Sequence, residues 1–263
     1  MQSSDAVGQV KKEMREKYDP IGRAILGSIE SGSLQDAETF VLGQTQPGQY
    51  WMEHKIGTAF GLGRFSKTDR LLEIGCTAGH YTMMLARQGY SVVGLDISAD
   101  SVRAAQALAR SLGLTQIDFI AADAEDMQGV PDNSFDGVFS FSTLRYVPNP
   151  IRSLCEIWRV LRPGGKAVVD FPNVYCPWFE FLKFLVGGER HPHDHTYSPK
   201  RVRRMMDEAG FVNIEVKLII FFAKQFPSSL TPLYKAVDWL FERTPGVRHF
   251  AGIIMCKGEK AAP

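Results

Sequence analysis

Short apolar runs alternate with helix-like patterns along this chain of 263 residues from Arg70 onward. Each apolar run predicts a strand, and apolar residues spaced three or four apart predict the helices between the strands. Five strands are predicted in this way, at 70–74, 91–95, 117–121, 136–141 and 166–171. Strands and helices that alternate along a chain are typical of a doubly wound parallel sheet.

The alternation is interrupted after the fifth predicted strand. Residues 173–197 carry an aromatic segment and a histidine-rich loop, and a helix is predicted to begin at Ser198-Pro199. Strand-like segments follow at 211–222 and at 250–256, the second pairing near the sheet edge. We therefore expect an α/β fold that is Rossmann-like, with a mostly parallel seven-stranded sheet.

A further helix is predicted between Pro227 and Pro245. Its apolar stripe consists of Leu233, Ala236, Val237, Leu240 and Phe241. Such a stripe is more often part of a core or a lid than a ligand-binding surface. We expect 173–197 and 223–249 to be inserted lid segments on the acceptor side of a main domain that spans 70–263.

Residues 1–69 precede the alternation and are predicted to form an N-terminal helical cap. Val7, Val10, Met14 and Tyr18 fall on one helical face, so an amphipathic helix is predicted over 5–17. The segment 43–63 is rich in glycine and aromatic residues, and its pattern is too irregular to assign an element.

Two glycines and a carboxylate mark the ends of the first two strands. Gly75 and Gly79 follow the first strand, and Asp96 ends the second strand, 21 residues after Gly75. Backbone N–H groups at such a turn can approach a ligand closely. A carboxylate at a strand end can accept hydrogen bonds from ribose hydroxyls. Together these features predict a nucleoside-binding crevice at the carboxyl edge of the sheet.

Composition and charge narrow the possible classes of protein. The chain is 44% hydrophobic and 22% charged, with a formal net charge of +1, which argues against binding of nucleic acid through bulk charge. The four cysteines form no closely spaced pair and are expected to be free thiols in a reducing compartment. The longest apolar run, 218–223, is far shorter than the ~20 residues that span a bilayer. The polar N-terminal segment does not resemble a signal peptide, so we expect a cytoplasmic protein.

Five motifs in order resemble those of the class I S-adenosylmethionine-dependent methyltransferases, chiefly the group that methylates small molecules. The motifs lie at 73–79, 95–98, 121–127, 135–147 and 161–165, and the resemblance covers about 70–222. It implies S-adenosylmethionine as the cofactor, and we expect no metal site. The cofactor contacts that it implies are Glu73, Gly75, Cys76, Thr77, Gly79, Asp96, Ile97, Asp123, Ala124 and Ser140.

The resemblance also implies a role for each motif. The loop at 75–79 wraps the methionine part of the cofactor, although the usual middle glycine is Thr77 here. Asp96 holds the ribose and Ile97 packs on the adenine. Asp123 accepts from the adenine amine and the Ala124 N–H reaches a ring nitrogen, while the Ser140 carbonyl holds the ammonium group.

Candidate acceptor residues come from three segments. His195 stands just before Ser198-Pro199, where the family often carries a histidine, and a neutral imidazole there could accept a proton from a hydroxyl acceptor. His193 and His54 are the next candidates for a base. The short stretch 191–195 cannot easily direct its histidines and Asp194 at one metal ion, and a solvated or helix-capping loop is the alternative. Candidate substrate contacts are Arg145, Tyr146, His54 and Trp178.

We therefore expect methyl transfer to a small oxygen or nitrogen acceptor of hydrophobic or aromatic character by in-line displacement. A protein that binds the cofactor without turnover is one alternative, and a protein or RNA methyltransferase is another. An NAD-binding domain expects G-x-G-x-x-G, which Thr77 breaks. The basic cluster at 200–204 is expected to be a solvated helix face, with an acidic acceptor or an anionic lipid surface as alternatives.

Overall fold

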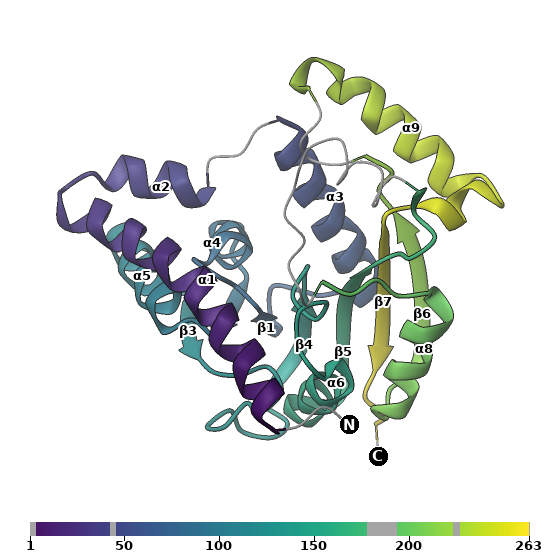
Figure 1. Ribbon diagram of the computed structural model, residues 1–263, viewed down its shortest axis with the longest axis horizontal. Coiled ribbons are helices and arrows are strands. Elements are labelled where there is room, and N and C mark those ends of the chain that lie inside the picture. Colours follow the sequence, from purple (N-terminus) through teal and green to yellow (C-terminus); the bar gives the residue numbers. More distant parts are fainter. Residues whose placement is uncertain (1–3, 43–45, 178–193, 223–226, 263) are drawn as a thin grey trace.

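The computed structural model describes residues 4–42, 46–177, 194–222 and 227–262. In these residues the strands form one seven-stranded sheet in the order β3-β2-β1-β4-β5-β7-β6 (Figure 1). The strands are β1 Arg70–Ile74, β2 Ser91–Asp96, β3 Ile117–Ala121, β4 Phe135–Ser140, β5 Leu161–Pro172, β6 Val212–Ile219 and β7 Ile253–Glu259. Strands β1 to β5 run parallel, whereas β7 runs antiparallel to both β5 and β6. The prediction of a mostly parallel seven-stranded sheet is confirmed.

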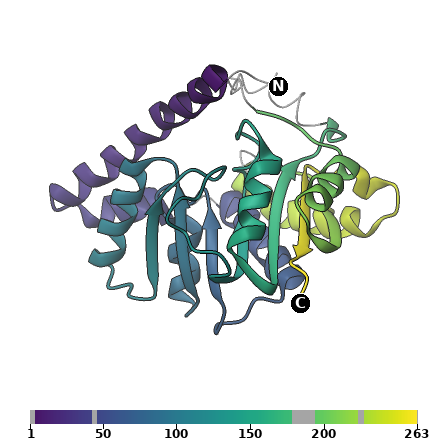
Figure 2. The same ribbon diagram turned by 90° about the horizontal axis from the view of Figure 1, so that it is seen from below.

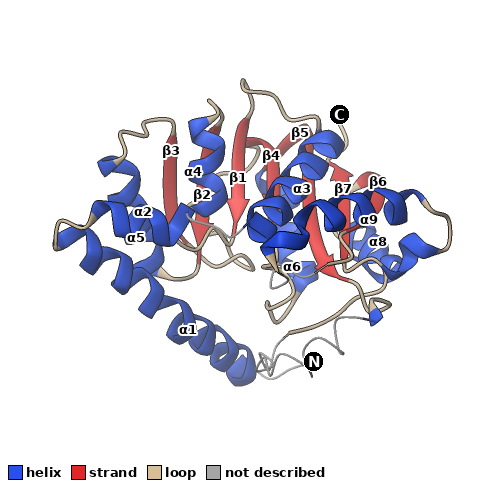
Figure 3. Ribbon diagram, turned by 90° about the horizontal axis from the view of Figure 1, so that it is seen from above, coloured by secondary structure: helices blue, strands red, loops and turns tan. Residues whose placement is uncertain are grey.

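Helices cover both faces of the sheet. The helices are α1 Ser4–Glu30, α2 Leu34–Leu42, α3 Gln46–Gly63, α4 His80–Arg87, α5 Ala99–Ser111, α6 Pro150–Val160, α8 Pro199–Glu208 and α9 Thr231–Arg243. Helices α6 and α8 bury their apolar residues on one face (Figure 2), and α3 and α4 bury theirs on the other (Figure 3). None of the helices in the described residues is long and apolar enough to cross a membrane.

The N-terminal helix is longer than predicted. We expected a helix over 5–17, but α1 continues through Pro20 to Glu30 and packs on α5. The two backbones meet closely at Gly22, where an added Cβ would lie 2.3 Å from the Asp100 carbonyl carbon. The first half of α1 extends beyond α5 and crosses the carboxyl edge of the sheet (Figure 2). The first half of α1 thus lies where the sequence predicts a binding crevice.

The sequence left the segment 43–63 without an assigned element. Residues Gln46–Gly63 form α3, which packs against β5 and β7 and buries Ile56 and Ala59. Each glycine within a helix costs about 1 kcal/mol relative to alanine. Burial of apolar side chains against the sheet offsets that cost, since most of a helix's stability in a folded protein comes from its packed face.

Candidate functional site

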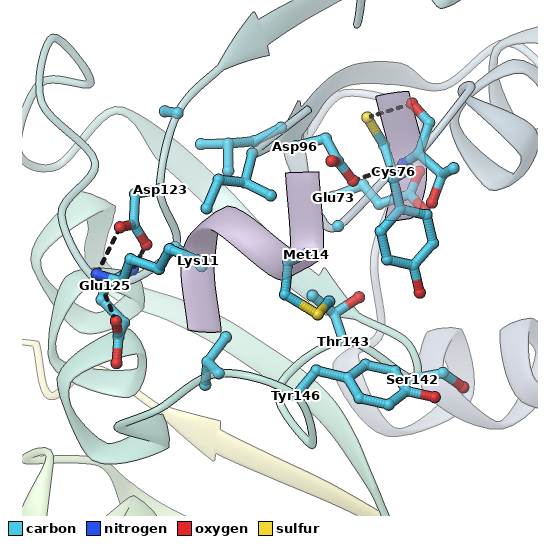
Figure 4. A pocket seen from close by; sticks show the side chains of 18 of the residues that line it. Lys11, Met14, Glu73, Cys76, Asp96, Asp123, Glu125, Ser142, Thr143 and Tyr146 are labelled. Atoms are coloured by element: carbon cyan, nitrogen blue, oxygen red, sulfur yellow. Dashed lines mark hydrogen bonds and ion pairs between the residues drawn. The ribbon is translucent and has the colours of Figure 1, made fainter. Parts of the chain in front are cut away.

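A cavity of about 280 Å³ lies at the carboxyl ends of β1, β2 and β4, beneath the first half of α1. Figure 4 shows side chains from α1 facing those from the strand ends across this space. It is lined by Val10, Lys11, Met14, Tyr18, Glu73, Gly75, Cys76, Thr77, His80, Tyr81, Leu95, Asp96, Ile97, Ala122, Asp123, Ala124, Glu125, Phe141, Ser142, Thr143, Tyr146, Val147 and Pro148. Most of the predicted cofactor residues are among them.

The loop after β1 leaves no room for a side chain at its first glycine. Gly75 has a φ of +79°, and an added Cβ would lie 2.0 Å from Thr143 Oγ1. Gly79 has a φ of +84° and precedes α4. Thr77 adopts a φ of +49°, which is a strained conformation for a β-branched residue. A glycine at this position would adopt the same φ without strain.

Asp96 joins the loop to the end of β2. Its Oδ2 accepts from the Thr77 N–H at 2.8 Å, and its Oδ1 accepts from the Ser98 N–H at 2.9 Å. The carboxyl is buried, and this burial raises its pKa although the backbone hydrogen bonds oppose the shift. Each carboxylate oxygen has a second lone pair. Both oxygens can therefore still accept from a ligand in the cavity.

Glu73, at the end of β1, and Cys76, within the loop, have buried side chains. Glu73 accepts from the Thr82 hydroxyl, and burial raises its pKa to about 7. Burial also raises the pKa of the Cys76 thiol, so this residue is a small packing group rather than a nucleophile. Ser140 lies just outside the lining, where its hydroxyl donates to the Ile74 carbonyl at 3.0 Å.

A lysine from α1 reaches the acidic motif after β3. Lys11 Nζ lies 2.6 Å from Asp123 Oδ2 and 2.6 Å from Glu125 Oε2 (Figure 4). Burial lowers the pKa of Lys11, but its hydrogen bonds to the two carboxylates outweigh this effect and leave the pKa raised. Asp123 Oδ1 accepts from the Glu125 N–H at 2.9 Å. A ligand that reaches Asp123 must share this carboxylate with Lys11.

Aromatic side chains line the end of the cavity near β4. The Tyr81 and Phe141 rings meet edge to face, with centroids 5.1 Å apart. Met14 and Tyr146 face each other across the space (Figure 4). Burial raises the pKa of Tyr18 to about 12 and also raises that of Tyr146, so both phenols stay protonated at neutral pH. This end of the cavity can hold a flat apolar molecule and offers it hydroxyl donors.

Sequence reasoning missed a buried ion pair behind that end. Lys55 Nζ lies 2.5 Å from Asp170 Oδ2, donates to Ser142 Oγ at 2.8 Å, and lies 3.9 Å from the centroid of the Trp51 ring. Asp170 Oδ1 accepts from the Ser142 N–H at 2.6 Å. Ser142 has a φ of +56°, so the pair holds a strained residue of the cavity wall. No sequence pattern marked Lys55, because the segment 43–63 was left unassigned.

The candidate acceptor residues are spread more widely. Arg145 Nε donates to Asp194 Oδ1 at 2.5 Å, and neither residue lines the cavity. His195 is exposed, and its backbone N–H donates to the Arg145 carbonyl at 3.3 Å. His54 Nε2 lies 2.6 Å from Glu242 Oε1 on α9, outside the cavity.

Trp178, His191 and His193 lie outside the described residues. Among the residues that the structure describes, no group of three or more His, Cys, Asp or Glu side chains could hold a metal ion.

The polar groups that line the cavity fit a nucleoside joined to an amino acid. Carboxylates at the ends of β2 and β3 can accept from sugar hydroxyls and from an exocyclic amine. The loop at 75–79 brings backbone close to the cavity, because Gly75 leaves no space for a Cβ. The chemistry of the lining therefore suits S-adenosylmethionine.

Known proteins with similar sequences are methyltransferases and related enzymes. The family model described as a methyltransferase domain matches residues 72–169. The demethylmenaquinone methyltransferase of a Geobacillus species is 30% identical over 178 residues, which cover 59% of this chain and 76% of that protein. An S-adenosyl-L-methionine-dependent Diels-Alderase of Talaromyces variabilis is 29% identical over 204 residues, which cover 71% and 68% of the two chains.

The fold is shared with solved structures. The crystal structure of the [4+2]-cyclase SpnF has a TM-score of 0.60 and 23% identity, and the match covers 82% of this chain and 83% of that one. A putative methyltransferase from Bacillus halodurans has a TM-score of 0.56 and 18% identity, with 80% and 100% covered. Together with the sequence relatives and the cavity, these matches show that the chain belongs to the class I S-adenosylmethionine-dependent methyltransferases.

Proposed function

We propose that this methyltransferase acts on a small acceptor of hydrophobic or aromatic character, at an oxygen or a nitrogen atom. The observation that carries the proposal is the aromatic end of the cavity, where Met14, Tyr81, Phe141 and Tyr146 surround the space near β4. Aromatic rings of this kind favour flat apolar ligands and also stabilise a nearby cation. The relatives named as demethylmenaquinone methyltransferase and ubiquinone biosynthesis O-methyltransferase are consistent with an aromatic acceptor, and the second name is also consistent with transfer to oxygen.

The cofactor would occupy the other end of the cavity. We assign the ribose to Asp96, the adenine to Ile97, Asp123 and Ala124, and the amino-acid part to the loop at 75–79 and the Ser140 carbonyl. The contacts of Asp96 with the N–H groups of Thr77 and Ser98 support this assignment, because they fix the carboxylate while leaving lone pairs available. When bound, S-adenosylmethionine supplies a methyl group on a positively charged sulfur.

The chain itself aligns the two ligands and excludes water. In-line displacement needs the acceptor atom, the methyl carbon and the sulfur on one line, so most of the rate gain comes from positioning. Helix α1 covers the cavity, and its contacts from Lys11 to Asp123 and Glu125 hold the cover in place. The enclosed space also prevents water from competing with the acceptor.

A base is needed where the acceptor carries a proton that must leave. His195 is our first candidate, with His193 next. The hydrogen bond from the His195 N–H to the Arg145 carbonyl ties this loop to the residue before Tyr146 in the cavity wall. Replacing His195 with Gln is expected to lower turnover and leave the affinity for S-adenosylhomocysteine unchanged. Full turnover in this variant would remove His195 from the mechanism.

The assignment of Asp96 is tested by titration calorimetry with S-adenosylhomocysteine. Asp96→Ala is expected to weaken binding by at least about tenfold, since a hydrogen bond to a charged group contributes ~1.5–3 kcal/mol. Asp207→Ala is the matched control, because Asp207 is an exposed carboxylate on α8, far along the chain from the cavity residues. Equal affinities for Asp96→Ala and wild type would refute the assignment.

The acceptor is tested with S-adenosylmethionine labelled in its methyl group, offered with phenols, hydroquinones, amines and carboxylates. Label in an aromatic product supports the proposal. Label only in added protein or RNA favours the macromolecular alternatives that the sequence left open.

A cofactor-dependent cyclisation without methyl transfer is a second candidate. The relative described as an S-adenosyl-L-methionine-dependent Diels-Alderase favours it, since it matches 71% of this chain. Methyl transfer consumes the cofactor, whereas cyclisation does not. A polyene substrate that cyclises equally well with S-adenosylhomocysteine and S-adenosylmethionine would support this candidate. Binding of cofactor without either reaction would indicate a protein that binds it without turnover.

A further inference from the structure

Large apolar side chains are exposed along the segment that contains α9. Between Pro227 and Phe250, five of them have 43% to 60% of their surface exposed, and we call these five the α9 patch. The α9 patch consists of Leu230, Leu233, Trp239, Leu240 and Phe250. Clustered apolar groups of this size on a surface mark a site of interaction with a membrane or a partner.

Helix α9 packs Tyr234 and Phe241 against the protein, but it exposes Leu233, Trp239 and Leu240. Its two carboxylates face the protein. Asp238 accepts from the Tyr50 hydroxyl at 2.8 Å and from the Phe221 N–H at 2.7 Å. Glu242 accepts from the Ile220 N–H at 2.9 Å. A surface helix normally buries its apolar stripe and exposes its charges, so the outward apolar face of α9 needs another explanation.

The exposed charges of this segment are all positive. Lys235, Arg243 and Arg248 are exposed, whereas Asp238 is fully buried and the Glu242 side chain is only 5% exposed. These two are the only carboxylates between residues 227 and 250, all of which the structure describes. The guanidinium of Arg243 lies 4.7 Å from the centroid of the Trp239 ring. An indole beside basic groups is typical of helices that lie in the headgroup region of a bilayer.

The α9 patch lies at the same sheet edge as the cavity. Asn173, which follows β5, donates through its amide to the carbonyls of His249 and Ala251 at 2.8 Å. The next residues, Val174 and Tyr175, are 50% and 55% exposed. Helix α9 packs over α3 and β6 at this side of the molecule (Figure 3). Large apolar side chains are therefore exposed both on α9 and directly after β5.

We propose that residues 227–250 dock this protein on an anionic lipid surface. Trp239 and Leu240 enter the interface between headgroups and acyl chains, and Lys235, Arg243 and Arg248 contact lipid phosphates. Charge complementarity selects this occupant, because a segment with exposed cations and no exposed carboxylate matches a negatively charged bilayer. The proposal does not depend on the identity of the methyl acceptor.

The basic face of α8 provides a contrast within the same chain. It exposes four cations, Lys200, Arg201, Arg203 and Arg204, beside the carboxylates Asp207 and Glu208, and none of its residues is among the exposed large apolar side chains. The α8 face is therefore also net positive, but it has no exposed large apolar side chain that could enter the bilayer beside its charges. The α8 face therefore serves as the control for charge alone.

Vesicle flotation with the purified full chain tests the proposal. Vesicles of phosphatidylcholine mixed equally with phosphatidylglycerol are compared with vesicles of phosphatidylcholine alone. Wild type is expected to float with the anionic vesicles only. Trp239→Ser combined with Leu240→Ser is expected to lower the partition coefficient by more than about tenfold. Arg203→Ala combined with Arg204→Ala is expected to bind within about twofold of wild type.

A second variant keeps the test independent of folding. Arg243→Glu combined with Arg248→Glu retains every apolar group and is also expected to lose more than about tenfold in binding to anionic vesicles. Circular dichroism confirms that each variant is folded. Failure of wild type to float, or equal flotation of the Trp239/Leu240 variant, would overturn the proposal. A wild-type dimer that the Trp239/Leu240 variant converts to monomer in the absence of lipid would overturn it too, and would make this face a contact between two copies.

Discussion

The buried pair of Lys55 and Asp170 allows a quantitative test of what holds the cavity wall. The Lys55 side chain is 0% exposed and that of Asp170 is 1% exposed, with Nζ and Oδ2 2.5 Å apart. Lys55→Met keeps the length of the aliphatic side chain and removes the charge. It leaves the Asp170 carboxylate buried beside the Ser142 N–H without the lysine cation. Removal of one partner from a buried ion pair costs ~3–5 kcal/mol of unfolding free energy.

That loss is a large part of a total stability of ~5–15 kcal/mol. At about 2–4 °C for each kcal/mol, the melting temperature is expected to fall by about 10 °C. Urea titration followed by far-ultraviolet circular dichroism measures the unfolding free energy directly. Lys12→Met is the control, since the Lys12 side chain is 67% exposed and pairs with Glu16 on the same helix face, and it is expected to change stability by less than about 0.5 kcal/mol.

The double variant Lys55→Met, Asp170→Asn separates the cost of a lone charge from the cost of lost packing. The asparagine introduced by Asp170→Asn would still offer a carbonyl to the Ser142 N–H, and no charge would remain buried. We expect the double variant to be more stable than Lys55→Met alone by at least about 2 kcal/mol. A loss below about 1 kcal/mol in the single variant, or additive losses in the double variant, would refute the reasoning.

Two further predictions concern the end of β1 and the loop at 75–79 that follows it. Burial raises the pKa of Glu73 from its usual 4.5 to about 7. Between these pH values the folded state holds a proton that the unfolded state has released. The unfolding free energy is therefore expected to fall by about 3 kcal/mol as the pH rises from 4.5 through 7. Glu73→Gln is expected to remove this dependence, and urea titrations of both proteins at pH 5 and pH 8 check it; parallel changes in the two proteins would contradict it. Because Thr77 has a φ of +49°, Thr77→Gly is expected to be more stable than Thr77→Ala by about 1 kcal/mol in the same assay, and equal stabilities would show that the loop is not strained there.

Much of the site followed from the sequence because of its position in a parallel sheet. Asp96 ends β2, and Asp123 follows β3 by two residues. The carboxyl ends of parallel strands meet at one edge, so residues that follow different strands become neighbours in space. Apolar periodicity predicted those strands, and Gly75 and Gly79 marked the turn where backbone could approach a ligand. These inferences needed only local patterns and one general rule of topology.

Contacts between distant segments could not be predicted in this way. Lys11 reaches Asp123, and Lys55 reaches Asp170, only because α1 and α3 pack across the carboxyl edge and face of the sheet. His54 was a candidate for substrate binding, yet α9 places Glu242 against it. No local pattern specifies which helix passes beside a given residue, since that choice depends on how all the elements bury their apolar surface together.

Local sequence patterns were enough to predict the sheet, the glycine loop and the carboxylates at the strand ends, since each depends on a few neighbouring residues. Packing between distant segments, in contrast, determines which face of α9 is turned inward. The apolar stripe was expected to pack against the protein, but Leu233 and Leu240 are more than half exposed. The N–H groups of Ile220 and Phe221 at the end of β6 require acceptors, and Asp238 and Glu242 supply them. An unsatisfied buried N–H group costs ~1–3 kcal/mol, so satisfying two of them offsets the exposure of apolar side chains on the other face.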